Sequence, residues 1–339
     1  MKFIKAFLVS SLVASLAYYC AVLLMIDTPV SAEYWVAEMI TVKKALVKEY
    51  AGTRKIIVAG GSSTLFSVDT EYASKQLDMP VINFGLHAGL RLNKIFKEVG
   101  AVIEGGDILI FQLEPQYYDC HPKLNLWQIN NIVGWDHDAW NEMSYVEKME
   151  FVSMVSPRLF VQMIIANIQR IYNEPLIYSR MAALDHSSTL RRFRARTTPA
   201  KMRYSIYNLN DHGDLMQTEG TITKVKSEDL GKPDHVCDTT ASQLAGFVEN
   251  MRAKGVQVYF ANTPFVSAAD LGEFRKGESS FLNDFNRVGC MIDKREDLVF
   301  DPKYFFDFKL HLNAQGRAIR TDLLIQSIRK NVLSGTCGH

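Results

Sequence analysis

The feature that most constrains this chain is an uncharged run near its N-terminus. Residues 6–26 read AFLVSSLVASLAYYCAVLLMI, with Lys5 before the run and Asp27 after it. As a helix this run is about 31 Å long, which matches the hydrocarbon core of a bilayer. Lys2 and Lys5 precede the run and Glu33 follows it, so the positive-inside rule places the N-terminus in the cytoplasm. We expect a single-pass protein of the inner (cytoplasmic) membrane with an extracytoplasmic, periplasmic domain.

A cleaved signal peptide is the alternative for this run. The segment 30–32 (VSA) resembles a small-residue cleavage site. However, the apolar core of a signal peptide usually has about 7–15 residues, and this run is longer. No second run of this kind occurs in the chain, so the sequence predicts one membrane span.

Composition excludes several classes of protein. The chain has 38 basic and 37 acidic residues, a net charge of +1, which argues against a nucleic-acid binder. The sequence shows no CxxC or Cys/His spacing, so neither a structural zinc site nor another metal site is expected, and no cofactor is expected. Outside the span, where disulfides form, one or two disulfides and four free thiols both remain open, and the sequence cannot choose among the three pairings. The four cysteines are Cys120, Cys237, Cys290 and Cys337.

Short apolar runs alternate with helical patterns on both sides of a central region. The β-rich runs are 55–59, 79–85, 107–113, 255–261 and 298–300. The helical patterns are 33–50, 70–77, 90–102, 241–254, 281–289 and 316–332. Strand–turn–helix alternation is typical of a parallel sheet in an α/β fold.

The central region interrupts this alternation. We expect amphipathic helices at 144–155 and 157–172, and we interpret the region as a mostly helical insertion with little sheet. The basic segment 191–196 (RRFRAR) is either a solvated face or a contact for anionic lipid or acidic polysaccharide. The predicted parts are an anchor with its cytoplasmic stub (1–32), a membrane-proximal helix (33–52), a first α/β part (53–120), the insertion (121–238) and a second α/β part (239–339).

Residues suited to nucleophilic catalysis follow several of these predicted strands. Ligands and catalytic groups of such sheets lie beyond the carboxyl ends of the strands. The segment 60–63 (GGSS) follows the first strand, and 83–89 (NFGLHAG) follows the second. Asp307 and His311 precede the last helix, and a spacing of four places them on one side of a helical turn. A serine nucleophile needs an imidazole to accept its proton and a carboxylate to orient the imidazole.

Together these segments resemble the SGNH (GDSL-type) hydrolase superfamily. The resemblance rests on GGSS at 60–63, NFGLHAGL at 83–90 and DFKLHLNAQG at 307–316, in that order, and it covers about residues 53–120 and 240–335. It implies a flavodoxin-like three-layer sandwich around a parallel sheet. The layout looks most like membrane-anchored proteins of polysaccharide modification, of the alginate O-acetylation and teichoic acid D-alanyl transfer types.

The resemblance also implies roles for particular residues. Ser62 would be the nucleophile, His311 the general base and Asp307 the residue that orients it. The oxyanion hole would use backbone N–H groups of Ser62 and of the glycine loop. The residues expected around the oxyanion and substrate are Gly61, Gly85, Gly89, His87, Gln112 and Asn262, with Gly89 favoured over Gly85.

The chain departs from the superfamily pattern at three places. Gly61 stands where the GDSL motif has aspartate, and the Asp–His pair is spaced D-x-x-x-H instead of D-x-x-H. The third strand ends in QLEP (112–115), so the GxND block is absent. Because ionised Glu114 cannot donate a hydrogen bond, Gln112 or Asn262 would have to supply the third oxyanion donor.

The function expected from the resemblance is O-acyl transfer, most simply of acetyl, to hydroxyls of a cell-surface polysaccharide through a serine acyl-enzyme. Its partners would be a polysaccharide acceptor and an acyl donor delivered by a membrane-bound O-acyltransferase. One alternative is a carbohydrate esterase (deacetylase) that uses the same triad. A second alternative is a non-catalytic partner of the acyltransferase that keeps the fold.

Overall fold

A computed structural model describes residues 2–26, 34–120, 124–171, 186–222, 235–266 and 280–337. The chain divides into two compact units. The helical unit comprises Met1–Ala37 and Leu124–Asp185, and the sheet unit comprises Glu38–Lys123 and His186–His339. The predicted cleavage site at 30–32 lies outside the described residues.

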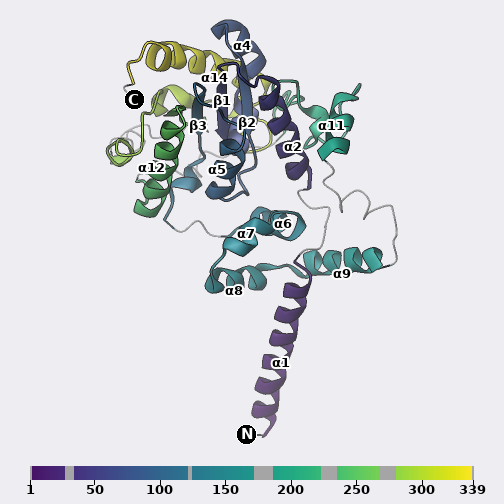
Figure 1. The fold of residues 1–339 in the computed structure, drawn as a ribbon. Coiled ribbons are helices and arrows are strands. Elements are labelled where there is room, and N and C mark those ends of the chain that lie inside the picture. The colour runs from purple at the N-terminus through teal and green to yellow at the C-terminus, as the bar shows by residue number, and fades with distance from the viewer. Residues whose placement is uncertain are drawn as a thin grey trace. The chain divides into compact units, whose positions relative to one another are not determined.

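The sheet unit is built on four parallel strands in the order β2-β1-β3-β4 (Figure 1). The strands are β1 (Ile56–Gly60), β2 (Val81–Gly85), β3 (Ile108–Gln112) and β4 (Gln257–Phe260). Every residue of β1, β2 and β3 is buried, and sheets buried on both faces are made of such continuous apolar runs. The predicted α/β class with a parallel sheet is confirmed.

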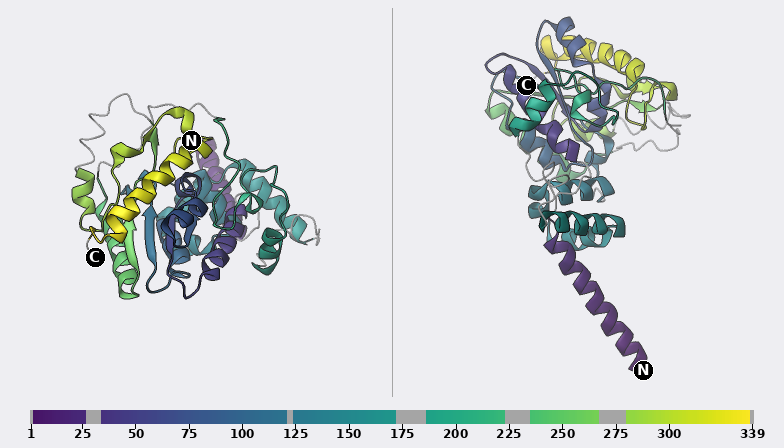
Figure 2. Two further views of the ribbon diagram at one scale, coloured as in Figure 1. Left: turned by 90° about the horizontal axis from the view of Figure 1, so that it is seen from above. Right: turned by 90° about the vertical axis from the view of Figure 1, so that its right-hand side faces the viewer.

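Helices cover both faces of this sheet. On one face, Ile56 and Ile110 share a core with Leu324 of the last helix. On the other face, Phe111 contacts Phe96 and Phe247. Seen from above, the last helix (yellow) crosses the sheet (Figure 2, left). The helices of this unit are α3 (Ser62–Ser67), α4 (Thr70–Leu77), α5 (Leu92–Gly100), α11 (His186–Arg194), α12 (Asp238–Ala253) and α14 (Ala314–Ser327), and residues 280–285 are also helical.

Smaller elements complete the sheet unit. Strand β6 (Val299–Phe300) forms where the sequence predicts a strand, but it pairs with β5 (Phe265–Val266) in a separate two-stranded sheet. The remaining turns are η1 (Pro115–Tyr118), η2 (Ile206–Asn208), η3 (Arg295–Leu298), η4 (Pro302–Tyr304) and the π-helical turn η5 (Ile328–Leu333).

The helical unit holds the N-terminal helix α1 (Lys2–Leu24), which is long and apolar enough to cross a membrane. Its other helices are α6 (Leu126–Gly134), α7 (His137–Glu142), α8 (Tyr145–Met154) and α9 (Pro157–Ile171). Val22 and Ile26 pack into one core with apolar residues of these four helices. The helix α2 (Tyr34–Glu49) begins in the helical unit and continues in the sheet unit.

The region predicted as one insertion (121–238) is divided between the two units. Residues 124–171 join α1, whereas 186–222 belong with the sheet. Asp214 shows the physical reason, because it is buried and accepts hydrogen bonds from Thr70 and Asn83 of the sheet unit. A buried polar residue that is fully hydrogen-bonded cannot be told from a surface one by composition.

The basic segment 191–196 lies at the end of α11 and beyond. Arg192 pairs with Glu38 at 2.6 Å, Arg196 pairs with Asp211 at 2.7 Å, and Arg194 pairs with Glu49. These arginines therefore serve contacts within the sheet unit, and their positive charges are partly neutralised there.

The structure resolves the pairing that the sequence left open. Cys120 is bonded to Cys237, and Cys290 to Cys337. Cys20 in α1 is a free thiol. Both disulfides lie within the sheet unit.

Candidate active site

Ser62 is the first residue of α3, directly after β1. The sharp turn depends on two glycines. A Cβ on Gly60 would lie 2.1 Å from the Gln112 carbonyl oxygen, and a Cβ on Gly61 would lie 2.4 Å from the Glu114 carboxylate. Only glycine fits such close approaches, so the glycine pair lets strand and helix meet at the carboxyl edge of the sheet.

Ser62, His311 and Asp307 are joined by hydrogen bonds. The His311 Nε2 atom lies 2.9 Å from Ser62 Oγ, and His311 Nδ1 lies 2.7 Å from Asp307 Oδ1. Because a carboxylate only accepts, Nδ1 carries the proton and Nε2 accepts the Ser62 hydroxyl proton. This is the arrangement that a serine nucleophile requires.

Asp307 and His311 come together in a backbone conformation that their spacing did not predict. Residues 307 and 311 are not in a helical turn but in a tight loop, which an antiparallel bridge between Phe305 and Leu312 closes. The loop is tied by the Phe306 N–H donating to the His311 carbonyl at 2.8 Å. The helical prediction was wrong because a spacing of four brings side chains together in a closed loop as well as in a helix.

Asn313 and Gly316 fix the end of this loop. The Asn313 side chain accepts the Gly316 N–H at 3.0 Å and so caps α14. A Cβ on Gly316 would lie 2.6 Å from the Tyr304 carbonyl oxygen. The cap and the close glycine contact in the segment HLNAQG (311–316) therefore hold His311 just before the start of α14.

The surroundings of the triad hold the imidazole and the carboxylate in place. The ring of Phe66 stacks on His311 with centroids 4.1 Å apart and planes 3° apart. The Tyr204 hydroxyl donates to Asp307 Oδ2 at 2.5 Å. Burial alone would raise the pKa of Asp307, but hydrogen bonds from His311 and Tyr204 and the charge of His311 hold this pKa below its usual value. Asp307 is therefore ionised at neutral pH.

The structure separates the two adjacent serines. Ser62 Oγ is bonded to His311, whereas Ser63 Oγ is buried with no hydrogen-bond partner among the described residues. The Ser63 backbone N–H donates to Glu114 at 2.7 Å. Only Ser62 is thus positioned as a nucleophile.

Glu114 is a residue of this site whose role sequence reasoning missed. Its carboxylate follows β3, is fully buried and accepts the N–H groups of Gly61 at 3.1 Å and Ser63 at 2.7 Å. Burial raises the pKa of Glu114 to about 7, against the lowering effect of those N–H groups. Gly61 makes room for this carboxylate, because a Cβ at this position would lie 2.4 Å from it. Gly61 and Glu114 are therefore linked in space, a relation that no spacing along the chain reveals.

The expected oxyanion donors are only partly available. The Ser62 N–H has no partner among the described residues, and the N–H groups on both sides of it bind Glu114. The Gly85 N–H donates to Asn83 Oδ1 at 2.8 Å. A Cβ on Gly85 would lie 2.3 Å from the Leu65 N atom, so Gly85 serves close packing against α3, and its expected role as a donor was wrong.

Gly89 and His87 form a small unit of their own. The Gly89 N–H donates to the Nδ1 atom of His87 at 3.0 Å, so His87 carries its proton on Nε2 when neutral. Burial and the neighbouring His311 lower the pKa of His87 to about 4. His87 is therefore neutral at pH 7, and the N–H group of Gly89, the favoured oxyanion donor, is directed at His87.

Asn262 and Gln112 lie in a buried ionic network. Both N–H groups of the Asn262 side chain and its backbone N–H are directed at Asp293. Arg320 donates to Gln112 Oε1 at 3.0 Å and to Asp293 at 2.9 Å. The expectation that Asn262 donates to the oxyanion was wrong, because Asp293 uses its N–H groups. Arg320 occupies only the Oε1 atom of Gln112, and the Nε2 atom of Gln112 is buried with no hydrogen-bond partner among the described residues. Gln112 as the third oxyanion donor therefore stays a prediction.

A buried lysine clamps the loop after β2. The Nζ atom of Lys43 donates to the Asn83 carbonyl at 2.9 Å and to the Gly85 carbonyl at 2.7 Å. Burial lowers the pKa of Lys43 to about 7, although the charge of Asp214 raises it. Lys43, Asn83 and Asp214 thus fix the strand end from which the glycine loop departs.

The surface of the sheet unit carries several pockets. One, of about 520 Å³, is lined by Lys201, Arg203, Glu219 and Phe306, among others. It lies near the triad, because the Phe306 ring is 6.1 Å from the ring of Phe66, which stacks on His311. No group of three or more metal-ligating side chains occurs in the part of the chain that the structure describes.

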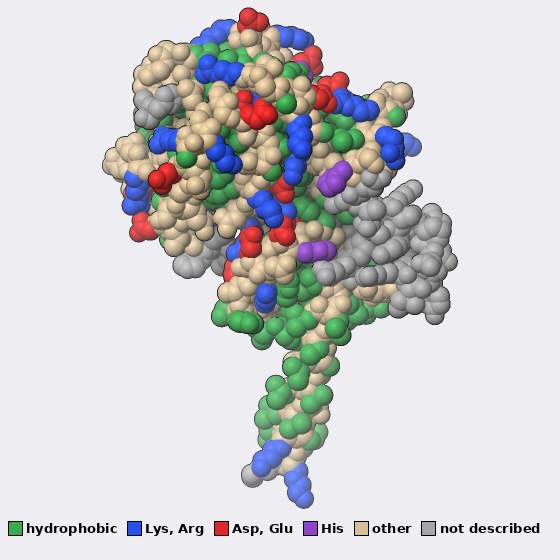
Figure 3. Space-filling view, viewed as in Figure 1, with side chains coloured by type: hydrophobic (Ala, Val, Ile, Leu, Met, Phe, Trp, Pro, Cys, Tyr) green, Lys and Arg blue, Asp and Glu red, His purple; other side chains and the backbone are tan. Residues whose placement is uncertain are grey.

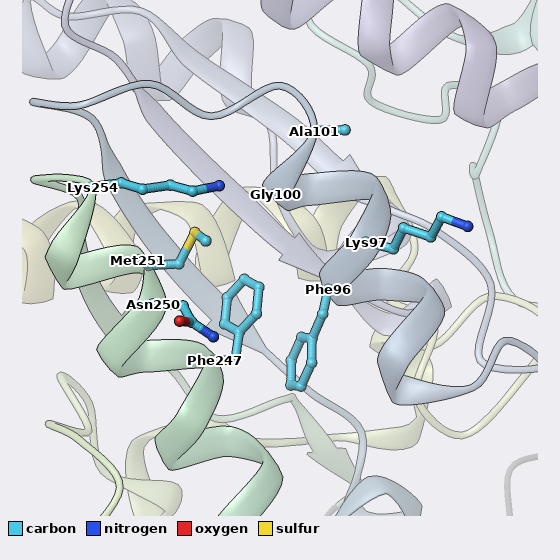
Figure 4. A pocket seen from close by; sticks show the side chains of 8 residues that line it. All are labelled: Phe96, Lys97, Gly100, Ala101, Phe247, Asn250, Met251 and Lys254. Carbon is cyan, nitrogen blue, oxygen red and sulfur yellow. The ribbon is translucent and has the colours of Figure 1, made fainter. Parts of the chain in front are cut away.

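A second pocket, of about 490 Å³, lies between α5 and α12 (Figure 4). The Phe96 and Phe247 rings stack in it with centroids 4.2 Å apart. The residues at its far end, Gly100 and Lys254, come from the C-terminal ends of these helices. Such ends lead into the strands, so this pocket lies toward the edge of the sheet opposite Ser62.

Comparisons with protein-family models, with curated proteins and with solved structures find no match to this chain.

Proposed function

We propose that this protein is an SGNH-type serine O-acyltransferase that transfers an acyl group, most simply acetyl, to hydroxyls of a cell-surface polysaccharide. The observation that supports catalysis best is the continuous hydrogen-bond chain from Ser62 through His311 and Asp307 to Tyr204. A scaffold that only keeps the fold would not need the Asp–His–Ser geometry. The chain of contacts therefore favours an enzyme over a non-catalytic partner.

The proposed reaction has two half-reactions. In the first, Ser62 Oγ attacks the acyl carbonyl while His311 Nε2 takes the serine proton, and protonated His311 then returns it to the leaving group. In the second, a sugar hydroxyl attacks the acyl-enzyme and gives its proton to His311, so that Ser62 leaves as the free hydroxyl. The Ser62 N–H, with His87 Nε2–H as a second donor, would stabilise the tetrahedral oxyanion.

The acceptor side of the proposal rests on the pocket beside the triad. Arg203 lies over the Phe306 ring, 5.1 Å from its centroid, and Lys201 and Glu219 line the same pocket. Aromatic and charged side chains together suit a sugar, which offers apolar C–H faces and hydroxyl groups. We assign this pocket to the polysaccharide acceptor. The acyl donor would come from a membrane-bound O-acyltransferase in the membrane that α1 crosses.

An acyl-enzyme measurement tests this proposal. The full-length protein in detergent is incubated with p-nitrophenyl acetate, and intact mass is measured for wild type, Ser62→Ala and Ser63→Ala. We expect an acetyl adduct of about 42 Da on wild type and Ser63→Ala and none on Ser62→Ala. An adduct that persists in Ser62→Ala, or that is lost in Ser63→Ala alone, would contradict Ser62 as the nucleophile.

The same experiment separates transfer from hydrolysis. Slow loss of the adduct in water, with faster loss when a polysaccharide is added, supports the transferase. Fast release of many equivalents of p-nitrophenol without an acceptor would support an esterase that uses the same triad. Neither adduct nor turnover on the wild type would favour the scaffold function instead.

A further inference from the structure

Helix α9 is apolar on two opposite sides. One side packs into the core of the helical unit through Leu159, Met163 and Ala166. The other side carries Val161, Ile165 and Ile168 at a spacing of four and three residues, and each is about half exposed. A helix that is apolar all round is normally buried, either in a protein core or in lipid. The outer side of α9 therefore needs a partner.

Helix α8 continues this exposed apolar surface. Tyr145, Val146 and Met149 lie on one side of α8 and are 88%, 78% and 58% exposed. The two helices meet at an angle of 94° and are together as apolar as a membrane span. With 10 and 15 residues they extend only about 15 and 22 Å, so neither crosses a bilayer alone. Within the helical unit they lie across the end of α1 and not along it (Figure 1).

Contacts with α1 fix the level of these helices relative to the bilayer. The Tyr18 hydroxyl donates to the Val155 carbonyl at 2.9 Å, and the Tyr18 ring lies 5.1 Å from that of Phe160. Tyr18 is 13 residues beyond Lys5 (18 minus 5), which is about 20 Å along the helix. A hydrocarbon core of about 30 Å that begins near Lys5 therefore ends about 10 Å beyond Tyr18. Amphipathic helices that lie in the interface are buried about 5–10 Å, at this same level.

The exposed surface of α8 and α9 is apolar, like the part of α1 that would face lipid. The apolar side chains of α1 from Phe3 to Leu16 are largely exposed, Val22 is the buried residue of this helix, and Leu24 beyond it is 86% exposed. Hydrophobic side chains cover both the stem and the surface at which α1 enters the helical unit (Figure 3). We therefore take lipid as the partner that covers the exposed apolar side chains of α8 and α9, as it would cover those of α1.

We propose that this surface lies in the outer leaflet of the membrane that α1 crosses and is covered by lipid at the boundary between headgroups and acyl chains. It is made of Tyr145, Val146, Met149, Val161, Ile165 and Ile168, and we call it the α8–α9 face. The helical unit is then attached to the membrane at two places, a span and an in-plane face, and it cannot tilt freely about α1. This inference does not depend on the enzymatic proposal.

Spin labels on the full-length protein test this proposal. In a Cys20→Ser background, which removes the free thiol, a nitroxide is attached to Met149→Cys or Ile165→Cys. The protein is reconstituted in vesicles of phosphatidylethanolamine and phosphatidylglycerol, and collisions with oxygen and with a water-soluble nickel chelate are measured. The control is Met202→Cys, because Met202 is a methionine of the sheet unit that is 70% exposed. All three side chains are exposed, so labelling leaves the core intact.

We expect the ratio of oxygen collisions to nickel collisions to be several-fold higher at positions 149 and 165 than at position 202. Equal ratios at the three positions would overturn the proposal, because the α8–α9 face would then be in water. Labels at 149 and 165 that neither reagent reaches would also overturn it. In vesicles that hold only this protein, that result would assign the face to a second copy of the chain.

Discussion

The turn after β1 (residues 60–63) and the loop after β2 (residues 85–89) are both rich in glycine and follow neighbouring strands, yet their backbone groups are used differently. In the turn, Glu114 accepts the N–H groups of Gly61 and Ser63 and leaves that of Ser62 without a partner among the described residues. In the loop, the N–H groups of Gly85 and Gly89 are bound by Asn83 and His87. Glycine at a strand end therefore does not by itself make an oxyanion donor. The side chains that reach the backbone decide which N–H remains for a substrate.

The two segments are also held by buried groups of opposite type. Glu114 accepts backbone N–H groups at the turn, whereas Lys43 donates to backbone carbonyl groups at the end of β2. Each group is fully buried, and burial shifts the pKa of each to about 7. In the proposed mechanism the turn carries the nucleophile and the loop is a rigid support beside it, and the substitutions below test this distinction.

The largest effect is expected at Asp307. Asn at this position presents an N–H group to His311 and favours the wrong imidazole tautomer, so the rate of acyl-enzyme formation should fall about 10,000-fold. Tyr204→Phe removes one hydrogen bond to the same carboxylate, and we expect a loss of about tenfold. The measurement is the burst rate with p-nitrophenyl acetate. An Asp307→Asn variant as fast as wild type would remove the triad from the mechanism.

Lys43→Met is expected to cost the most stability. The substitution keeps the apolar stem, but it leaves buried carbonyl oxygens of Asn83 and Gly85 without their donor and removes a charge that faces Asp214. We expect the free energy of unfolding in denaturant to fall by about 3–5 kcal/mol.

The adjacent lysine is the matched control for this substitution. Lys44 pairs with Glu98 at 2.9 Å with its side chain one-third exposed, so Lys44→Met should cost less than about 1 kcal/mol. Equal losses of unfolding free energy for both variants would show that the hydrogen bonds of Lys43 to the end of β2 stabilise the fold no more than a partly exposed ion pair does.

Glu114→Gln is expected to change how stability depends on pH. The folded-state pKa of Glu114 is about 7, above the ordinary value for glutamate. Wild type therefore binds an extra proton when folded and loses stability as pH rises from about 4.5 to 7, by about 3 kcal/mol in total. Gln does not titrate, so the unfolding free energy of wild type relative to that of Glu114→Gln should fall by this amount as the pH rises from about 4.5 to 7.

Unfolding free energies of both proteins at the two ends of this range provide the measurement. The Gln side chain also places an amide N–H group against a backbone N–H of the turn, which should lower the stability of the variant by about 1–3 kcal/mol below pH 4.5. A difference between the two proteins that stays constant with pH would mean that Glu114 is ionised throughout.

The smallest effect is expected at His87. If the loop is mainly structural, the Ser62 N–H provides most of the oxyanion stabilisation, and His87→Ala, which removes the second proposed donor, should slow acyl-enzyme formation about tenfold. Because its pKa is about 4, His87 stays neutral between about pH 5 and pH 8, and the size of this effect should not change across that range. A loss of a thousandfold or more would make the loop an equal partner in the oxyanion hole and would break the distinction from the turn.

The local elements of this protein follow from its sequence. Buried parallel strands are continuous apolar runs, so β1, β2 and β3 could be recognised within one or two residues, and the uncharged run gave α1. Residues that act through local geometry could also be found, such as Ser62 at a glycine turn and His311 with Asp307 in one short loop. The polar edge of a parallel sheet then suggested that these residues would meet.

Which polar groups meet one another depends on the tertiary fold. Glu114 lies more than fifty residues from Ser62 and Tyr204 more than a hundred from Asp307. Only folding therefore brings Glu114 to the serine turn and the Tyr204 hydroxyl to the Asp307 carboxylate. Gly85 and Asn262 have the right chemistry for oxyanion donors, but Asn83 and Asp293 take their N–H groups. A hydrogen-bond donor serves only one strong acceptor at a time, and which acceptor arrives depends on the packing of distant segments.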